Sequence, residues 1–342
     1  MLIAPGVGSL LGIGLTAAAD RWSRRGIAAF GAGTFALAFA MFAWAPNGAT
    51  ITAAAALAGF GATGMVDAVE VGLLDISTSD RLRVWLARQN IAGVAGDLVA
   101  PAVLAALAFA GLGWRVAFAT GAVGLGAYAV LLATAPLPPP DPGEDDPDED
   151  DQGSGSTRDV LRDPRVWVIG LLSLLAVPFD EPFFGFLIAH LGQTRGVAAG
   201  TATTIAAISV CGGLLVHGLA ARRPLRASNR VLFMIGAAAM LVGSLVVTAA
   251  TALPVVALAA CAVCGGLDLC WLAIQHRGLT LRPKQAGQTK AVISTLENLG
   301  FGLPLAIGAV ADSATLTAAM ATFALLAALL LVVAARAKHA LG

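Results

Sequence analysis

The chain has 342 residues, of which 58% are hydrophobic and 12% are charged, and its 21 basic and 21 acidic residues cancel to a net charge of zero. A soluble chain of this length cannot hide so much apolar surface, so the composition excludes an ordinary soluble domain. A zero net charge gives no indication of nucleic-acid binding.

Eleven apolar stretches follow one another along the chain. Each is close to the roughly 20 residues that a helix needs to cross a bilayer. Barrel strands alternate apolar and polar residues, whereas these stretches are apolar all round, so we expect helices. They cover about 1–19, 27–44, 50–75, 89–110, 114–136, 166–191, 198–220, 230–250, 253–275, 289–310 and 313–335.

The basic residues fall in every second gap between these stretches. Nineteen of the 21 Lys and Arg residues share one set of gaps, and only Arg115 and Arg195 lie in the other set. The gap before the tenth stretch holds Arg277, Arg282, Lys284 and Lys290. Because cytoplasmic loops are enriched in Lys and Arg, the pattern predicts an inner-membrane (plasma-membrane) protein with its C-terminus in the cytoplasm.

A polar segment over 137–164 separates five stretches from six. It is rich in Pro, Gly and Ser, and it carries eight acidic residues between 141 and 151. Such a composition predicts a solvated cytoplasmic linker between a helical half at 1–136 and another at 165–342. A cation-binding or regulatory role of the acidic run is the alternative.

The two halves resemble each other weakly. Pro101, after Gly96, lies in the fourth stretch, and Pro304 occupies the matching place in the tenth, 203 residues later. A repeat of six helices fits this offset, so the pattern predicts two pseudo-symmetric halves of 6 + 6 spans, of which 5 + 6 are seen here. We expect the missing helix to precede Met1, either through a late start codon or through a real truncation.

The turn after the first stretch reads Asp20-Arg21-Trp22-Ser23-Arg24-Arg25. It resembles the turn between the second and third helices of the major facilitator superfamily (MFS), with Thr16 and Ser23 in place of two glycines. Gly96-Asp97-Leu98-Val99-Ala100-Pro101 is similar to an antiporter motif of the same family. The resemblance covers the whole chain. It implies an all-α transporter fold and a conformational latch formed by Asp20, Arg21, Arg24 and Arg25; the alternative is that these arginines only set topology.

Acidic residues within the stretches are the main chemical signal. Such groups are costly in hydrocarbon and mark ion or substrate pathways. Pro178 and Pro182 flank one pair of acids and predict a broken helix there. No buried Lys or Arg is expected beside these acids, so we interpret them as proton- or cation-binding groups. The candidates are Asp67, Glu70, Asp97, Asp180, Glu181, Asp268 and Glu297; hydrogen bonding between helices is the alternative.

No enzyme motif and no metal-ligand spacing stands out in the sequence, and we expect neither a cofactor nor a metal. The pair Cys261 and Cys264 has redox spacing but lies inside a span, where cysteine packs as a small hydrophobe. His190 and His217, near span ends, are weaker candidates for a proton relay.

The predicted function is proton-coupled efflux of a small cationic or amphipathic molecule by alternating access. Uptake by the same fold, or a non-transporting receptor or scaffold, are the alternatives. The predicted partners are the substrate, protons and the lipid bilayer, without nucleic acid, and we expect a monomer.

Overall fold

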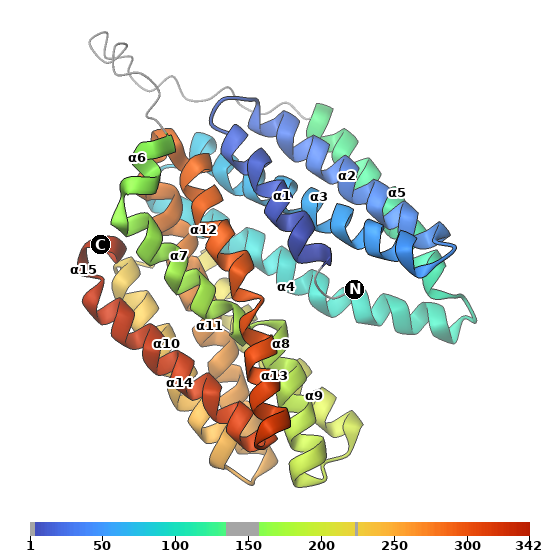
Figure 1. Ribbon diagram of the computed structural model, residues 1–342, viewed down its shortest axis with the longest axis vertical. Coiled ribbons are helices and arrows are strands. Elements are labelled where there is room, and N and C mark those ends of the chain that lie inside the picture. Colours follow the sequence, from blue (N-terminus) through green and yellow to red (C-terminus); the bar gives the residue numbers. More distant parts are fainter. Residues whose placement is uncertain (1–3, 135–156, 223–224) are drawn as a thin grey trace. The chain divides into compact units, whose positions relative to one another are not determined.

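The computed structural model describes residues 4–134, 157–222 and 225–342, with the backbone alone at 79, 80, 97, 101, 105 and 108. All regular elements in these ranges are helical, which confirms the predicted all-α class (Figure 1). In chain order they are α1 (Ala4–Ala18), α2 (Arg24–Trp44), α3 (Gly48–Ile76), α4 (Ser79–Phe109), α5 (Trp114–Thr134), α6 (Thr157–Arg162), α7 (Pro164–Ala176), η1 (Val177–Phe179), α8 (Glu181–Ala189), η2 (His190–Thr194), α9 (Ala199–Arg222), α10 (Asn229–Ala249), α11 (Leu253–Leu281), η3 (Pro283–Gln285), α12 (Ala286–Gly300), α13 (Leu303–Ser313), α14 (Leu316–Arg336) and α15 (Lys338–Leu341).

Each of the eleven predicted stretches coincides with a helical segment. Within the described ranges, nine segments are long and apolar enough to cross a membrane. The described part of α1 has only 15 residues, and α4 is also outside that group. The linker predicted at 137–164 lies outside the described residues up to position 156.

The helices gather into two compact units, each of which is described by itself. The first unit comprises Met1–Leu82, Gly96–Asp163 and Gly278–Asn298, and the second comprises Arg83–Ala95, Pro164–Arg277 and Leu299–Gly342. The boundaries of the units differ from those of the predicted halves. Most of α12 belongs to the first unit, and Arg83–Ala95 of α4 belongs to the second. The functional division at 1–136 and 165–342 stays a proposal.

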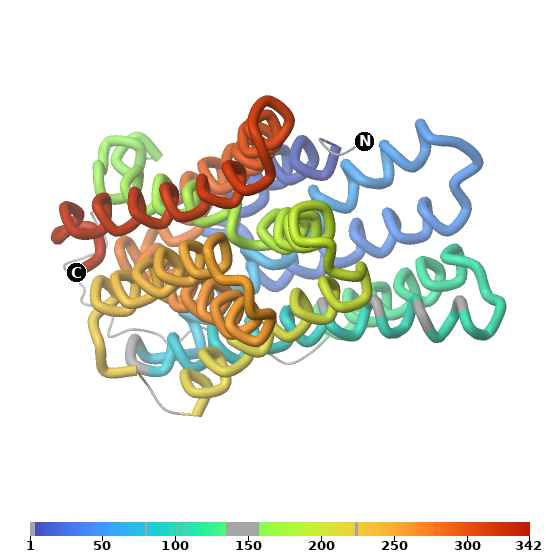
Figure 2. The backbone as a smooth tube through the Cα atoms, turned by 90° about the horizontal axis from the view of Figure 1, so that it is seen from below, coloured from blue at the N-terminus to red at the C-terminus, as the bar shows by residue number. Residues whose placement is uncertain are grey.

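Close backbone contacts hold the first unit together. Helix α3 packs against α1 and α2, and α2 packs against α5, as the blue and green helices of Figure 2 illustrate. A Cβ atom at Gly8 or Gly59 would overlap the carbonyl oxygen of Ala56 or Pro5, respectively. Small residues at such positions let membrane helices approach closely.

Arginine bonds show that α2 and α5 are antiparallel. At one end Arg25, in the first turn of α2, donates from Nε to the carbonyl oxygen of Leu132 near the end of α5 (2.8 Å). At the other end Arg115, at the start of α5, donates from Nη2 to the carbonyl oxygen of Ala45, just after α2 (3.0 Å). The arrangement agrees with alternate membrane crossing; which end faces the cytoplasm stays a prediction.

In the second unit, helix α14 packs against α7, α8, α10 and α13. The ring of Phe323 lies 5.4 Å from that of Phe179 and 5.3 Å from that of Phe183, and all three side chains are buried. These rings hold the interrupted segment α7–η1–α8 against an unbroken helix. Aromatic packing against α14 therefore fixes the two sides of the interruption.

Candidate functional site

Asp20, just after α1, binds the beginning of α12. Its carboxylate accepts hydrogen bonds from the backbone N–H groups of Gly287 (2.7 Å) and Gln288 (2.8 Å). The first N–H groups of a helix lack partners within the helix and carry partial positive charge, so a carboxylate is well suited to this place. Gly287 permits the approach, because a Cβ atom there would lie 2.6 Å from the Thr16 carbonyl oxygen.

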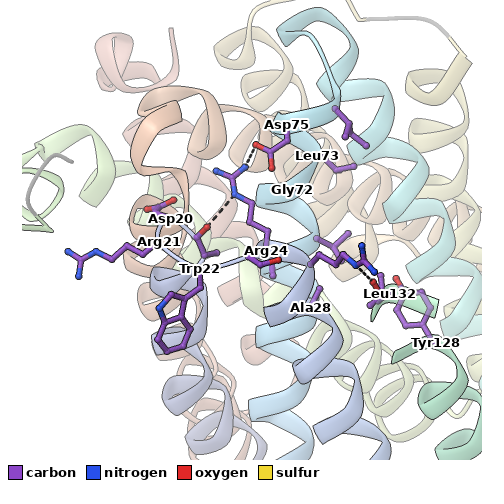
Figure 3. A pocket seen from close by; sticks show the side chains of 16 residues that line it. Asp20, Arg21, Trp22, Arg24, Ala28, Gly72, Leu73, Asp75, Tyr128 and Leu132 are labelled. Carbon is purple, nitrogen blue, oxygen red and sulfur yellow. Dashed lines mark hydrogen bonds and ion pairs between the residues drawn. The ribbon is translucent and has the colours of Figure 1, made fainter. Parts of the chain in front are cut away.

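The two neighbouring arginines bind the ends of other helices. Arg24 pairs with Asp75 and donates to the carbonyl oxygens of Val71 (3.0 Å) and Ala19 (3.3 Å). Figure 3 shows this side chain reaching from the α1–α2 turn to Asp75 at the end of α3. Helix C-termini expose carbonyl oxygens and partial negative charge, which guanidinium groups complement.

The same turn borders a cavity of about 610 Å³, which is also lined by the start of α2 and by the ends of α3 and α5. The side chain of Arg21 is exposed, unlike those of Arg24 and Arg25. The four predicted latch residues thus have different surroundings. Asp20 contacts α12, whereas Arg24 and Arg25 contact the ends of α3 and α5. The latch formed by this group stays a prediction.

A buried charge cluster lies among α1, α3 and α12. The Lys290 Nζ atom is 2.9 Å from Glu70 Oε2 and 3.5 Å from Asp67 Oδ1. The hydroxyls of Thr16 (2.8 Å) and Ser294 (3.2 Å) both donate to Asp67 Oδ2. All three charged side chains are at least 89% buried.

The expectation of no buried base is therefore wrong for Asp67 and Glu70. The sequence placed Lys290 in a cytoplasmic gap, whereas α12 begins at Ala286 and carries Lys290 one turn inside the helix. Thr16 and Ser294 were also missed. Their only sequence signal is a polar residue within an apolar stretch, and that signal does not identify a partner on another helix.

The acids of the second unit have different surroundings. Asp180 precedes α8 at the interruption between α7 and α8, with Pro178 in η1 and Pro182 in the first turn of α8. The side chains of Asp180 and Glu181 are both exposed. The two prolines and the interruption occur together, as the sequence predicts, and the break leaves these carboxylates outside the packed rings.

Asp268 on α11 is paired with a histidine. The His217 Nε2 atom on α9 lies 3.0 Å from Asp268 Oδ1, with side-chain exposures of 1% and 14%. The other oxygen, Asp268 Oδ2, is 4.0 Å from the Cys264 sulfur. The sequence ranked His217 below the acids because it lies near a span end, and no local spacing links it to Asp268.

The remaining candidates are less informative. Glu297 is half-buried on α12, two turns after Lys290, and the neighbouring Asn298 donates to the Ser294 carbonyl oxygen (2.8 Å).

The side chains of Asp97 and Pro101 lie outside the described residues, although the α4 backbone runs unbroken through both and through Gly96. Pro304 is in the first turn of α13, after the break that follows Gly300. Among the described residues, no group of three or more His, Cys, Asp or Glu could hold a metal.

Comparison with known proteins identifies the family. The model of the Major Facilitator Superfamily matches residues 1–305. A search of curated proteins gave no match. Among solved structures, the fold resembles a double-tryptophan mutant of XylE, with a TM-score of 0.75 at 16% identity, covering 97% of this chain and 83% of that one.

Two other transporters have similar folds. FucP in its outward conformation gives a TM-score of 0.75 at 15% identity, covering 97% of this chain and 89% of that one. The human organic anion transporter MFSD10 gives 0.73 at 17% identity, covering 97% and 83%. At these identities the likeness shows the fold alone, but the family model spans most of the sequence. The chain is therefore a multi-pass integral membrane protein that belongs to the Major Facilitator Superfamily.

Proposed function

We propose that the chain is a secondary active transporter, which moves a small molecule by alternating access of two helical halves and is coupled to protons. The observation that carries this proposal is the way α12 is held in the first unit. Its first two turns are bound by the Asp20 carboxylate and by the pairing of Lys290 with Asp67 and Glu70.

These contacts differ from the other contacts of the same unit. Helices α1 and α3 touch through backbone at Gly8 and Gly59, where separation would lose close dispersion contacts between the two helices. The α12 contacts are hydrogen bonds and ion pairs, which water can replace when a helix moves away. A helix held by replaceable contacts suits an element that changes partners during a transport cycle.

For the cargo, we propose a cationic or amphipathic molecule that is exported in exchange for protons. Asp180, Glu181 and Asp268 lie on membrane-crossing segments of the second unit. Carboxylates in such segments attract cations and protons and disfavour anions. The sequence likeness of Gly96–Pro101 to an antiporter motif supports export.

Uptake is the second candidate. XylE is described as a proton:xylose symporter and FucP of E. coli as a fucose:proton symporter, and both share this fold. A shared fold leaves the direction of coupling open. Symport of a neutral sugar would use the same carboxylates to carry the proton.

Proteoliposomes with an imposed pH gradient test both candidates. Antiport predicts that vesicles loaded with ethidium release it faster when the outside is acidified, and that nigericin abolishes the effect by collapsing the gradient. Symport predicts instead that xylose or fucose accumulates with the protons. If a folded protein moves none of these probes under a gradient, we would abandon transport of these classes in favour of a receptor or scaffold.

A pair of glycine variants tests the role of α12. In Gly287→Ala the new Cβ would lie 2.6 Å from the Thr16 carbonyl oxygen and 2.8 Å from Asp20 Oδ1. A shift of this kind costs about 1–3 kcal/mol, so we expect gradient-driven flux to fall about tenfold. Gly308→Ala on α13 is the control, because nothing lies within 4 Å of its Cβ position. Equal flux in both variants would show that the α12 contact plays no part in the cycle.

A further inference from the structure

The second unit contains a histidine and a carboxylate, His217 and Asp268, that lie within hydrogen-bonding distance of each other. We propose that His217 and Asp268 form a dyad that exchanges one proton for one monovalent cation, and that Gly213 is the residue that positions the Asp268 carboxylate. The inference rests on the proposed coupling to protons and assigns that coupling to one place in the fold.

The geometry allows one proton to be shared. His217 Nε2 and Asp268 Oδ1 are 3.0 Å apart, within hydrogen-bonding distance, and the His217 side chain is 99% buried. Its other ring nitrogen, Nδ1, is buried and has no hydrogen-bond partner in the described part of the chain. Buried polar atoms are normally hydrogen-bonded, so this open nitrogen indicates a place for water or a bound group.

The charge of the dyad changes by one unit when the proton leaves. With the additional proton bound, the pair is either an imidazolium beside a carboxylate or a neutral imidazole beside a carboxylic acid, and it is neutral overall. After release to water, a neutral imidazole and a carboxylate remain, with a net charge of −1. A lone negative charge is unfavourable in a low-dielectric interior, so the occluded pair takes up either a proton or a cation. Such replacement is the elementary step of one-for-one antiport.

The other described groups beside this carboxylate carry no positive charge. On α11, the Cys264 sulfur lies 4.0 Å from Asp268 Oδ2. Cys264 is also within electrostatic range of Cys261 and of Asp180 at the α7–α8 interruption. These groups are neutral thiols and a carboxylate, so the positive charge comes from His217 itself, from a proton, or from the cargo.

Gly213 on α9 leaves room for the Asp268 carboxylate because it has no side chain. A Cβ atom at Gly213 would overlap Asp268 Oδ2 and would lie 3.5 Å from the Cys264 sulfur. The absence of a side chain on α9 thus leaves the space that the carboxylate fills, one helical turn from His217. Gly218 on the same helix has nothing within 4 Å of its Cβ position, which makes Gly218→Ala a matched control.

The experiment follows the proton and the cargo separately. Infrared difference spectra after a pH step, recorded on purified protein without cargo, report the carboxyl group that binds the proton. We expect a protonated-carboxyl or imidazolium band that is lost in Asp268→Asn, altered in His217→Gln, displaced in Gly213→Ala and unchanged in Gly218→Ala. In proteoliposomes, Asp268→Asn and Gly213→Ala should lower acid-driven ethidium release at least tenfold while passive exchange of ethidium persists.

Two results would overturn the proposal. One is a pH-step spectrum of Asp268→Asn and His217→Gln identical to that of the unaltered protein. The other is undiminished acid-driven release in a folded Gly213→Ala protein. If the unaltered protein shows the band but moves no ethidium, the proton-binding dyad stands and the proposed cargo class fails, so the two proposals are separable.

Discussion

The two units place charged groups in membrane helices in opposite ways. In the first unit, Asp67 and Glu70 are paired with Lys290, and lysine is a side-chain type that is ordinarily charged at physiological pH. In the second, Asp268 is paired with a histidine, His217, and imidazole is the side-chain type that most often serves as a proton-binding group at physiological pH. A permanent cation suits a cluster that holds helices together in one conformation of the cycle, whereas a titratable partner suits a group that takes up and releases protons. We therefore expect the first cluster to affect stability most and the second to affect coupling.

The largest expected effect is that of Lys290→Met. Removing one member of a buried ion cluster leaves uncompensated charge, which typically costs about 3–5 kcal/mol. Thermal unfolding in detergent should show a clear fall in the midpoint temperature for Lys290→Met. Lys338→Met, at an exposed lysine of α15, is the control that should leave the midpoint unchanged.

A double variant makes this test sharper. Adding Glu70→Gln to Lys290→Met removes one of the two carboxylates as well, so the net charge of the cluster returns to −1. Part of the lost stability should then return. No loss in the single variant, or no recovery in the double variant, would mean that the cluster is not the helix-holding contact that the comparison requires.

The second expected effect is that of Lys290→His, which gives the first unit a titratable base like that of the second. A protonated imidazole beside Asp67 and Glu70 preserves the attraction at low pH, and that attraction is lost as the pH rises through neutrality. We expect stability close to that of the unaltered protein at acidic pH and close to that of Lys290→Met at alkaline pH. Unfolding midpoints measured across this range, beside the unaltered protein, provide the check. If the difference in unfolding midpoint between Lys290→His and the unaltered protein did not change with pH, the positive charge at position 290 would not be what stabilises the cluster.

The sequence predicts what depends on neighbours along one helix. Asp67 and Glu70 share a face because they are three residues apart, and Pro178 and Pro182 predict the interruption before α8. Alternating basic gaps predict the order of crossings. All these signals are local or periodic, and the structure has the helices and the interruption where they indicate.

The partners of these acids could not be predicted in the same way. Lys290 reaches Asp67, and His217 reaches Asp268, across helices that are distant in the chain. Which residue of one helix faces which residue of another depends on helix rotation and depth, and hydrophobic patterning fixes neither when a helix is apolar all round. Lys290 illustrates the consequence: it lies at the start of the predicted stretch at 289–310 and was grouped with the basic residues of the preceding gap, whereas in the structure it lies in a buried cluster.

The smallest expected effect separates charge from geometry in the first unit. Arg24→Lys keeps a positive charge beside Asp75 but loses the guanidinium fork that also reaches the carbonyl oxygens of Val71 and Ala19. Lysine cannot replace a planar group that binds several acceptors at once, so we expect a loss of about 1 kcal/mol, the worth of a typical hydrogen bond. Arg21→Lys, at the exposed arginine of the same turn, should cost nothing measurable. Chemical-denaturant unfolding of both variants measures the difference. An equal, negligible effect of both variants would mean that the positive charge of Arg24 is sufficient for this turn and that the hydrogen bonds of its guanidinium group to Val71 and Ala19 are not needed.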